Sequence, residues 1–301
     1  MTTPALALDA DPARQRGLLL VALAALLWSL GGLLVRFLGD VDVWTVVFWR
    51  STFAVLFLAG FLAWRDRGRA LQVFLAIGWP GLLVAVCFAA ASTAFVVAVS
   101  LTTVANVLIV LATAPLMAAG LARLVLKEPV RRATWLAMLA ALAGVALMVS
   151  GSAAHGSLVG DAIAFVTAFC FALAAVTIRR HRAVRMTPAV GLGAAIAALA
   201  TLPFAAPLAV AGADFGLLAV FGTVQYGLGL ALFATGARLA PAAPVAMLTM
   251  LEPILGPLWV WLVLAEHPGA MALLGGTVVL TALVANTAAD WRRARPVPPA
   301  A

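Results

Sequence analysis

Two charged side chains, Arg50 and Glu252, lie deep inside long apolar stretches of this 301-residue chain. A charge at the centre of a lipid bilayer costs roughly 3 kcal/mol or more unless it is paired, neutralised or hydrated. Arg50 could therefore bind a carboxylate carried by a substrate, or it could form a structural ion pair or reach toward the membrane surface. Glu252 could take part in proton coupling or bind a substrate ammonium group. Alternatively, it could be a carboxylic acid that donates to a backbone carbonyl freed by Pro253.

Further polar or amphipathic side chains fall at a similar depth in other apolar stretches. A glutamine amide in hydrocarbon needs hydrogen-bond partners on other helices or in water, which makes Gln225 a strong candidate to line a cavity. Its neighbour Tyr226 is the only tyrosine of the chain. Serine and threonine hydroxyls can bond to their own helix, so each of them is individually consistent with a structural role. The candidates for the cavity are Trp28, Ser29, Arg50, Ser92, Thr93, Thr113, Gln225, Tyr226, Thr249 and Glu252.

Three prolines are candidates for hinges. A proline inside a membrane helix removes one backbone hydrogen bond and frees the carbonyl four residues earlier. Pro115 lies in the middle of one apolar stretch, whereas Pro253 and Pro257 share a face of another. These two would free the carbonyls of Thr249 and Pro253. We expect both helices to bend or flex at these points, with a static kink as the alternative. The segment 78–81 is expected to divide a third stretch into an interfacial turn and a shorter span.

Ten apolar stretches position these residues, and each is close to the ~20 residues that a helix needs to cross ~30 Å of hydrocarbon. They are 17–38, 43–64, 72–99, 103–126, 130–150, 158–180, 187–210, 214–237, 241–264 and 268–288. Hydrophobic residues make up 65% of the chain and charged residues 10%, which leaves little sequence for a soluble domain. We therefore expect an all-α integral membrane protein with ten transmembrane helices.

Lysine and arginine occur almost entirely in, or within a turn of, every second gap between these stretches. Of the 19 basic residues, only Arg36 and Arg50 lie elsewhere. Because short loops rich in Lys and Arg stay cytoplasmic, both termini are expected in the cytoplasm of a bacterial inner membrane protein. This topology also explains the net charge of +8, so nucleic-acid binding is not expected. The first 16 residues are polar and mixed in charge, and a cleaved signal peptide is not expected.

The chain contains an internal repeat of five spans. A shift of 138 positions aligns Pro115 with Pro253 and Glu128 with Glu266, and a shift of 143 aligns Trp28 with Phe171. An odd number of spans per unit forces the second unit to enter the membrane inverted. Two inverted repeats around a central cavity are typical of secondary transporters. The expected units are a cytoplasmic tail at 1–16, a first repeat at 17–151, a second repeat at 157–289 and a cytoplasmic tail at 290–301.

Small residues indicate where the two halves meet. Helices in lipid adhere mainly through close packing at Gly, Ala and Ser. The fifth stretch contains Gly144 and the tenth contains Gly275, and both stretches close a repeat and hold almost nothing polar. We therefore assign these two stretches to the contact between the halves, with ordinary bundle packing as the alternative.

No group of residues indicates catalysis, a metal or a cofactor. His155, His181 and His267 lie in expected loops, and no zinc, P-loop or paired-aspartate motif occurs. An enzyme and an ATP-driven pump are therefore not expected. Cys87 and Cys170 lie inside spans, where a thiol behaves as a small apolar group, so no disulfide is expected.

The chain resembles the EamA-domain family of the drug/metabolite transporter superfamily over nearly its whole membrane region. The resemblance rests on the two five-span repeats and on the segments 28–29, 48–50, 114–128 and 251–266. It implies a ten-helix basket, export of amino acids or related amphipathic metabolites, and turnover by alternating access. It also implies that Arg50 and Glu252 occupy familiar positions of the family. The second repeat departs from the pattern at 191–193, where no arginine corresponds to Arg50.

These features favour an exporter of small metabolites, with amino acids as the first expectation. A cavity with Trp28 and Tyr226 would suit aromatic or hydrophobic ones. Coupling to protons is a hypothesis that rests on Glu252 alone. A channel or passive facilitator is the alternative, followed by a membrane-embedded enzyme. The expected partners are a small-molecule substrate and membrane lipid, and the sequence does not indicate an oligomeric state.

Overall fold

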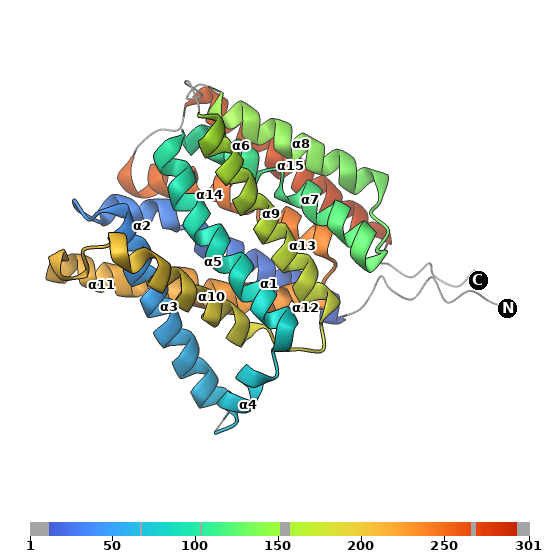
Figure 1. The fold of residues 1–301 in the computed structure, drawn as a ribbon. Helices are drawn as coiled ribbons and strands as arrows, with labels where there is room; N and C mark the ends of the chain where they lie inside the picture. The colour runs from blue at the N-terminus through green and yellow to red at the C-terminus, as the bar shows by residue number, and fades with distance from the viewer. Residues whose placement is uncertain (1–11, 67, 103, 151–156, 266–268, 294–301) are drawn as a thin grey trace, which may run out of the picture.

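The computed structural model describes residues 12–66, 68–102, 104–150, 157–265 and 269–293, and in these ranges the chain forms helices and loops without a β-strand (Figure 1). The first half contains α1 (Pro12–Ser29), α2 (Gly31–Phe37), α3 (Val43–Asp66), α4 (Ala70–Leu75), α5 (Gly78–Leu101), α6 (Val104–Leu111), α7 (Ala114–Leu121), the π-helix η1 (Ala122–Leu126) and α8 (Arg132–Val149). The second half contains α9 (Leu158–Arg180), α10 (Thr187–Thr201), the 3-10 turns η2 (Leu202–Phe204) and η3 (Pro207–Ala209), α11 (Gly212–Val220), the π-helix η4 (Phe221–Leu228), α12 (Gly229–Leu239), α13 (Ala242–Leu248), α14 (Leu251–Leu264) and α15 (Ala270–Arg293).

Eight helical segments of the described chain are long and apolar enough to cross a membrane, and two shorter apolar segments complete a set of ten. The eight are Pro12–Phe37, Val43–Asp66, Gly78–Ala98, Asn106–Leu126, Leu158–Arg180, Thr187–Phe204, Gly212–Leu239 and Ala242–Leu264, and the two shorter ones are Arg132–Met148 and Ala270–Asn286. Each overlaps one of the ten apolar stretches of the sequence. The expectation of an all-α membrane protein is confirmed, and spans 1 to 10 below follow this order.

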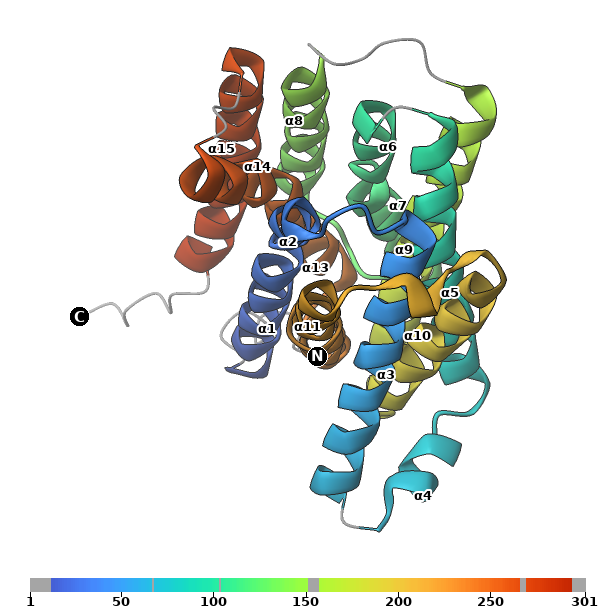
Figure 2. The same cartoon turned by 90° about the vertical axis from the view of Figure 1, so that its left-hand side faces the viewer.

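Several spans are interrupted, and two interruptions fall at two of the three prolines expected to be hinges, whereas α14 continues through the third, Pro257. α6 gives way to α7 just before Pro115, and α13 gives way to α14 just before Pro253. A proline has no N–H, so the hydrogen-bond ladder of the preceding helix cannot continue through it. The third stretch is also divided, but just before the expected segment 78–81: α4 ends at Leu75, and α5 begins at Gly78, which has φ +54°. Span 1 also breaks, at Leu30, where α2 lies directly above α1 in Figure 2.

The break between α13 and α14 differs from the expectation in one respect. The carbonyl of Thr249 is not left free, because it accepts a hydrogen bond of 3.1 Å from the backbone N–H of Glu252. The chain tightens into a 3-10-type turn at this point instead of losing the bond. A carboxylic acid at Glu252 is therefore not needed to satisfy that carbonyl.

Contacts between the two repeats come in equivalent pairs, as a two-fold relation requires. α1 packs against α12, and their counterparts in the other repeat, α9 and α5, also pack together. In the same way α3 packs on η4, while α10 packs on α5. Equivalent helices meet in the pairs α3 and α10, and α8 and α15. The equivalent spans 4 and 9 meet through α7 of the first and α13 of the second. This pattern fits two inverted repeats.

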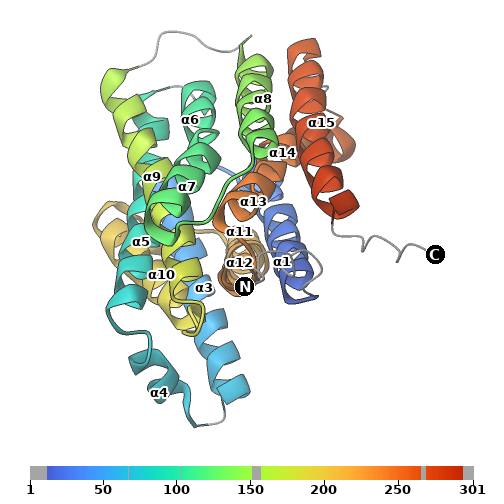
Figure 3. The ribbon, with the colours of Figure 1, turned by 90° about the vertical axis from the view of Figure 1, so that its right-hand side faces the viewer.

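α8 and α15 form the expected contact between the ends of the repeats, and Figures 1 and 3 show them side by side. A Cβ placed on Gly144 would lie 2.8 Å from the carbonyl oxygen of Gly275, so only small residues allow this approach. The buried hydroxyl of Thr134 donates to Oδ1 of Asn286 over 3.0 Å across the same contact.

A left-handed backbone conformation recurs at equivalent positions of the two repeats. Lys127 and Ala265 are the non-glycine residues of the described chain with positive φ, at 56° and 54°. They are 138 positions apart, which is the shift that aligns Pro115 with Pro253. Each follows the last helical turn of a span, after η1 and after α14. Because L-residues seldom adopt this conformation, its recurrence supports the repeat independently of side-chain similarity.

The bundle is packed unequally along its length. We call the end that carries Arg65, Arg179 and Arg238 the basic end, and the opposite end the far end. In spans 1, 8 and 9 the segments nearer the basic end, α1, α12 and α13, contain many buried residues. The segments nearer the far end, α2, α11 and α14, contain only Leu218 and Ile254 as buried residues. In these three spans, the half nearer the basic end is therefore packed more tightly than the half nearer the far end.

Candidate functional site

Arg50 lies in the interior, in the far half of α3, and does not reach toward the membrane surface. Its Nη2 donates to the hydroxyl of Ser92 on α5 over 3.0 Å. Its guanidinium carbon lies 4.3 Å from the ring centre of Tyr226 and 5.7 Å from that of Phe221, both on η4. A Cβ on Gly222 would lie 2.6 Å from the Arg50 carbonyl oxygen, so this glycine allows α3 and η4 to approach closely enough for the stacking.

Glu252 lies in the first turn of α14 and its side chain is exposed. When ionised, its carboxylate would attract the guanidinium of Arg50. In the described part of the chain, however, no nitrogen of Arg50 lies within 4.0 Å of a carboxylate oxygen. The Nε atom of Arg50 is enclosed and has no hydrogen-bond partner there. The structural ion pair considered for Arg50 is thus not formed in this structure.

The π-helix η4 explains how Gln225 and Tyr226 both face the interior. A π-helix carries about one extra residue in its wider turn, and such segments often occur at functional sites. Both side chains are buried. The Nε2 of Gln225 donates to the carbonyl oxygen of Trp28 over 2.9 Å. That carbonyl lies at the end of α1, where the break at Leu30 removes its usual helical partner. The amide nitrogen of Gln225 is therefore already used by the protein, whereas its Oε1 has no partner among the described residues.

Trp28 is buried in an aromatic cluster. Its ring centre lies 5.3 Å from that of Phe233 and 6.2 Å from that of Phe171, the residue aligned with it in the second repeat. Phe88 completes the cluster at 5.9 Å from Phe233. The ring of Trp28 is thus largely occupied by packing between the repeats.

Ser29 takes part in a hydrogen-bond chain at the break of span 1. Its hydroxyl donates to the carbonyl of Leu26 over 2.6 Å and accepts from the indole N–H of Trp259 over 2.9 Å. Trp259 was not among the residues expected at the site. Its position two turns after Glu252 on the same helix is the only indication in the sequence.

The threonines at the two proline breaks bond to their own helices. The hydroxyl of Thr113 donates to the carbonyl of Val110 over 2.6 Å, and that of Thr249 donates to the carbonyl of Ala246 over 2.7 Å. These bonds satisfy each hydroxyl locally, which fits the structural role considered for them. Thr93 is half-buried beside Ser92 on α5.

The structure therefore divides seven of the ten expected residues between two groups, and Thr93, Thr113 and Thr249 belong to neither. One group contains Arg50, Ser92, Tyr226 and Glu252, with Phe221 as an unexpected member. The other surrounds the break of span 1 and contains Trp28, Ser29 and Gln225, joined by Trp259. Glu266, His155 and His267 lie outside the described residues.

The two cysteines lie on packed helices of different repeats, Cys87 on α5 and Cys170 on α9. Cys87 belongs to a buried hydrophobic cluster against which Cys170 packs, and both thiols are free. Within the described ranges there is no group of three or more His, Cys, Asp and Glu side chains that could hold a metal ion.

An ion pair joins the two repeats at the basic end. Nε of Arg179, at the end of α9, lies 2.9 Å from Oε1 of Glu128, which follows span 4. Nη1 of Arg179 also donates to the carbonyl of Arg238 at the end of α12 over 3.2 Å. One side chain therefore connects the ends of three spans.

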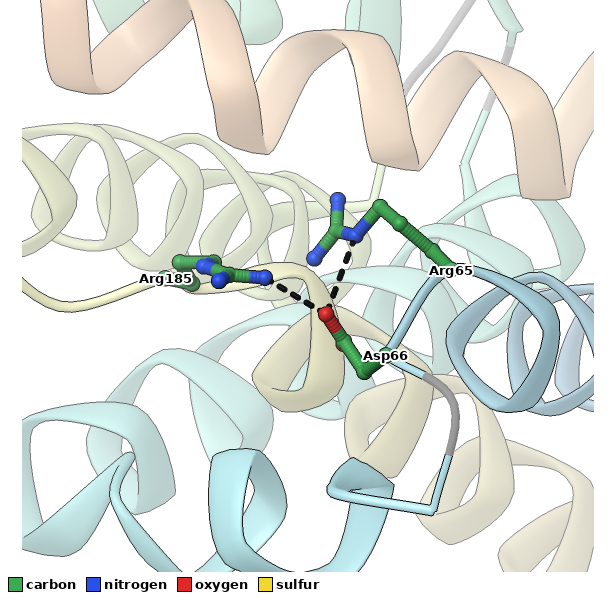
Figure 4. Close-up of polar contacts among 3 residues, drawn as sticks. All are labelled: Arg65, Asp66 and Arg185. Atoms are coloured by element: carbon green, nitrogen blue, oxygen red, sulfur yellow. Dashed lines mark hydrogen bonds and ion pairs between the residues drawn. The ribbon is translucent and has the colours of Figure 1, made fainter.

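A second ionic group connects α3 with the loop before α10 at the same end (Figure 4). Oδ1 of Asp66 lies 2.7 Å from Nη1 of Arg185 and 3.5 Å from Nε of Arg65. The Asp66 carboxylate is nearly enclosed, since its side chain is 7% exposed.

Small side chains fill the space beneath these ion pairs. They come from spans 4, 6 and 9 and form two layers in which every member is at most 1% exposed. The layers consist of Ala118, Ala172 and Ala246, and of Ala122, Val176 and Ala242.

Ten apolar helical segments, two inverted repeats and charged side chains held between them define a multi-pass membrane protein with a polar site inside the bundle. The sequence matches the EamA-like transporter family over residues 15–150 and again over 158–288, and the chain belongs to this family. It is therefore a membrane transporter, which implies a small-molecule substrate.

A crystal structure described only as that of a protein is similar over 93% of this chain and 99% of its own, with a TM-score of 0.81 and 20% sequence identity. This similarity concerns the fold alone. A search of curated proteins finds no match.

Proposed function

We propose that the protein is a secondary transporter that exports small metabolites, with amino acids as the substrate class, by alternating access across the bacterial inner membrane. The observation that carries this proposal is the placement of Arg50 and Glu252 between two inverted repeats, above a closed basic end. Inverted repeats can exchange conformations, so the same site can face each side in turn. The repeats are taken as residues 17–151 and 157–289.

In this proposal the basic end faces the cytoplasm, because Lys and Arg are retained there. The structure then corresponds to a state that is closed to the cytoplasm by the alanine layers and by Arg179. The breaks at Pro115 and Pro253, with Pro257 further along α14, would be the points at which spans 4 and 9 change direction during the exchange.

The aromatic groups near the charges support an amphipathic substrate with an aromatic or hydrophobic side chain. Tyr226 and Phe221 lie against Arg50, and Trp259 lies along α14 beyond Glu252. Rings of this kind bind apolar and aromatic groups by stacking and area burial. An unbiased comparison of the metabolites retained by cells with and without the protein would identify the substrate.

Counterflow in proteoliposomes tests the transport mechanism. Vesicles loaded with an unlabelled substrate should accumulate the labelled form transiently, and the initial rate should saturate with concentration. A channel or passive facilitator with both ends open would show no such overshoot. An absence of counterflow for every metabolite that the protein releases from cells would refute alternating access.

Coupling to protons is a separate part of the proposal and depends on Glu252. The Glu252→Gln variant should lose the pH dependence of transport in vesicles, since its side chain cannot exchange a proton. If its rate and pH dependence both equal those of the unsubstituted protein, Glu252 does not couple protons to transport.

The orientation is tested by labelling single introduced cysteines from outside the cell. Positions at the far end, such as Asp40, should react with a membrane-impermeant maleimide. Positions at the basic end, such as Arg182, should react only after the cells are opened. The opposite result would reverse the assignment of the two ends.

A further inference from the structure

We propose that the site recognises a zwitterion: Arg50 binds the carboxylate of the substrate and Glu252 binds its ammonium group. The inference rests on the proposed function, because it specifies which metabolites enter the site. It excludes amines and simple carboxylic acids of the same shape as good substrates.

The contacts of Arg50 leave one edge of its guanidinium available to bind a carboxylate. Tyr226 covers one face of the group at 4.3 Å, and Ser92 takes one donor of Nη2. Stacking uses the face of a guanidinium and leaves the donors on its edge. Nη1 has no partner in the described residues and is not among the enclosed side-chain atoms. The edge formed by Nη1 and the second donor of Nη2 can therefore hold a planar carboxylate through two hydrogen bonds.

The electrostatic state of Arg50 also calls for an anion. A guanidinium stays charged under all physiological conditions, and its burial without a paired anion is costly. A serine hydroxyl and two aromatic rings stabilise it only in part. No carboxylate of the described chain touches it, although Glu252 is near enough for the two charges to interact. A substrate carboxylate would supply the missing counter-charge.

Glu252 provides the complementary half of the site. Its side chain is exposed and forms no ion pair in the described part of the chain, so a ligand can approach it. The carboxylate of Glu252 would balance the charge of an ammonium group bound there. A positive and a negative side chain that interact without touching match the two charges of one amino acid better than those of a singly charged molecule.

Ser92 and Tyr226 act as positioning residues in this arrangement. Their contacts orient the guanidinium plane and need not touch the substrate carboxylate. Ser92→Ala should therefore weaken the preference for the zwitterion while the overall fold and the binding of amines are retained.

The test uses the purified full-length protein and three matched sets of ligands, based on phenylalanine, leucine and threonine. Each set contains the amino acid, the amine without its carboxylate and the acid without its ammonium group. Thermal stabilisation of the detergent-solubilised protein gives the affinity for each compound. For at least one set, the amino acid should bind at least tenfold more tightly than either analogue.

The variants identify which side chain carries each preference. Arg50→Gln should lower the affinity for the amino acid at least tenfold and leave that for the amine unchanged, so their ratio approaches one. Arg50→Lys should restore part of the ratio, because it keeps the charge but loses the two-pronged edge. Glu252→Gln should remove the preference over the acid instead. Arg36→Gln, a charge removed near the far end of span 1, serves as the matched control and should change neither ratio.

The inference fails if no set shows a preference for the zwitterion, if nothing in the panel binds, or if Arg50→Gln weakens amine and amino acid equally, as a purely structural arginine would. Counterflow measured on the same preparation keeps the two proposals apart. Selective binding without counterflow would refute the transport mechanism alone, whereas counterflow without charge selectivity would refute the zwitterion site alone.

Discussion

At the basic end, spans 4 and 6 meet through small buried residues, whereas the aligned residues at the far end are larger and only half-buried. Ala122 and Val176 are each 1% exposed at the basic end. Val260 and Leu33 are aligned with them by the shifts of 138 and 143, and both are partly accessible. The repeated helices therefore do not by themselves decide which end is closed. Side-chain size and the ion pairs above the alanine layers favour closure at the basic end.

Adding one methyl group to span 8 should have opposite consequences at its two ends. At Gly236, a new Cβ would lie 2.6 Å from the carbonyl oxygen of Gly17, which is backbone and cannot move aside. We expect Gly236→Ala to destabilise the protein by roughly 1–3 kcal/mol. At Gly216, near the far end, nothing lies within 4 Å, and Gly216→Ala should be neutral or stabilising by about 0.5–1 kcal/mol. Thermal unfolding in detergent compares the two, and equal losses would refute the difference in packing.

Removing Arg179 should open the basic end. Arg179→Gln loses the ion pair with Glu128 and weakens the contact with the end of α12, which together are worth roughly 1–2 kcal/mol. The labelling of Ala246→Cys by a water-soluble maleimide, with Cys87 and Cys170 replaced by alanine, should then accelerate about tenfold.

Arg180→Gln is the control for that experiment, because it removes an equal charge from the exposed neighbouring position. The same acceleration in both variants would show that the net charge of the end, and not the contact with Glu128, controls access. Exchanging the charges in Glu128→Arg with Arg179→Glu should bring the rate back toward its original value.

The α3 and α10 pair offers a test of ionic against neutral contacts. At the basic end it is joined by Asp66 and Arg185, whereas near the far end the hydroxyl of Thr45 accepts from the backbone N–H of Ala206 over 2.7 Å. Raising the ionic strength from about 0.1 to 1 M should weaken the Asp66–Arg185 ion pair and lower the free energy of unfolding by roughly 0.5–1 kcal/mol. The hydrogen bond between Ala206 and Thr45 should not respond to salt. Asp66→Asn should reduce this salt dependence, while Thr45→Val should leave it intact. Chemical unfolding at both salt concentrations provides the measurement.

The smallest effect is expected at Asp42, which caps α3 at the far end. Its burial raises the pKa, but the hydrogen bonds that its carboxylate accepts from the side chain and backbone of Thr45 and from the backbone of Trp44 lower it further, so the net pKa falls below the ordinary value. A lowered pKa in the folded state means that Asp42 stabilises the protein above the ordinary pKa near 3.9 and loses this contribution as the pH falls through the folded value.

Asp42→Asn should keep the cap and cost only a few tenths of a kcal/mol at neutral pH. The variant should lose stability less steeply than the unsubstituted protein between about pH 4 and pH 2. Parallel pH dependences for the two proteins would show that the carboxylate contributes nothing to this cap.

The arrangement of spans and breaks was largely accessible from the sequence because the bilayer imposes it. Apolar length predicts each crossing, and the absence of an N–H at Pro115 and Pro253 predicts the breaks of spans 4 and 9, although α14 continues through Pro257. The depth of Arg50 and Glu252 in the membrane follows from counting residues from the ends of their spans. These features depend on one helix at a time, so no knowledge of neighbouring helices is needed.

The partners of these side chains could not be predicted, because they depend on how helices face one another. The π-helix that turns Gln225 and Tyr226 inward has no sequence signal, and without it Gln225 appears available to a substrate. The bond from Trp259 to Ser29 joins two residues 230 positions apart. That Cys87 and Cys170 pack in one hydrophobic cluster depends equally on the packing of α5 against α9.

The left-handed residues Lys127 and Ala265 show how duplication has treated backbone and side chain differently. The turn was copied with its dihedral angle nearly unchanged, while one copy carries an ammonium group and the other a methyl group. A substitution at this position can therefore change the charge at one membrane surface without changing the backbone turn. Protein engineers can use the same freedom to move a charge from one side to the other while leaving the polypeptide path in place.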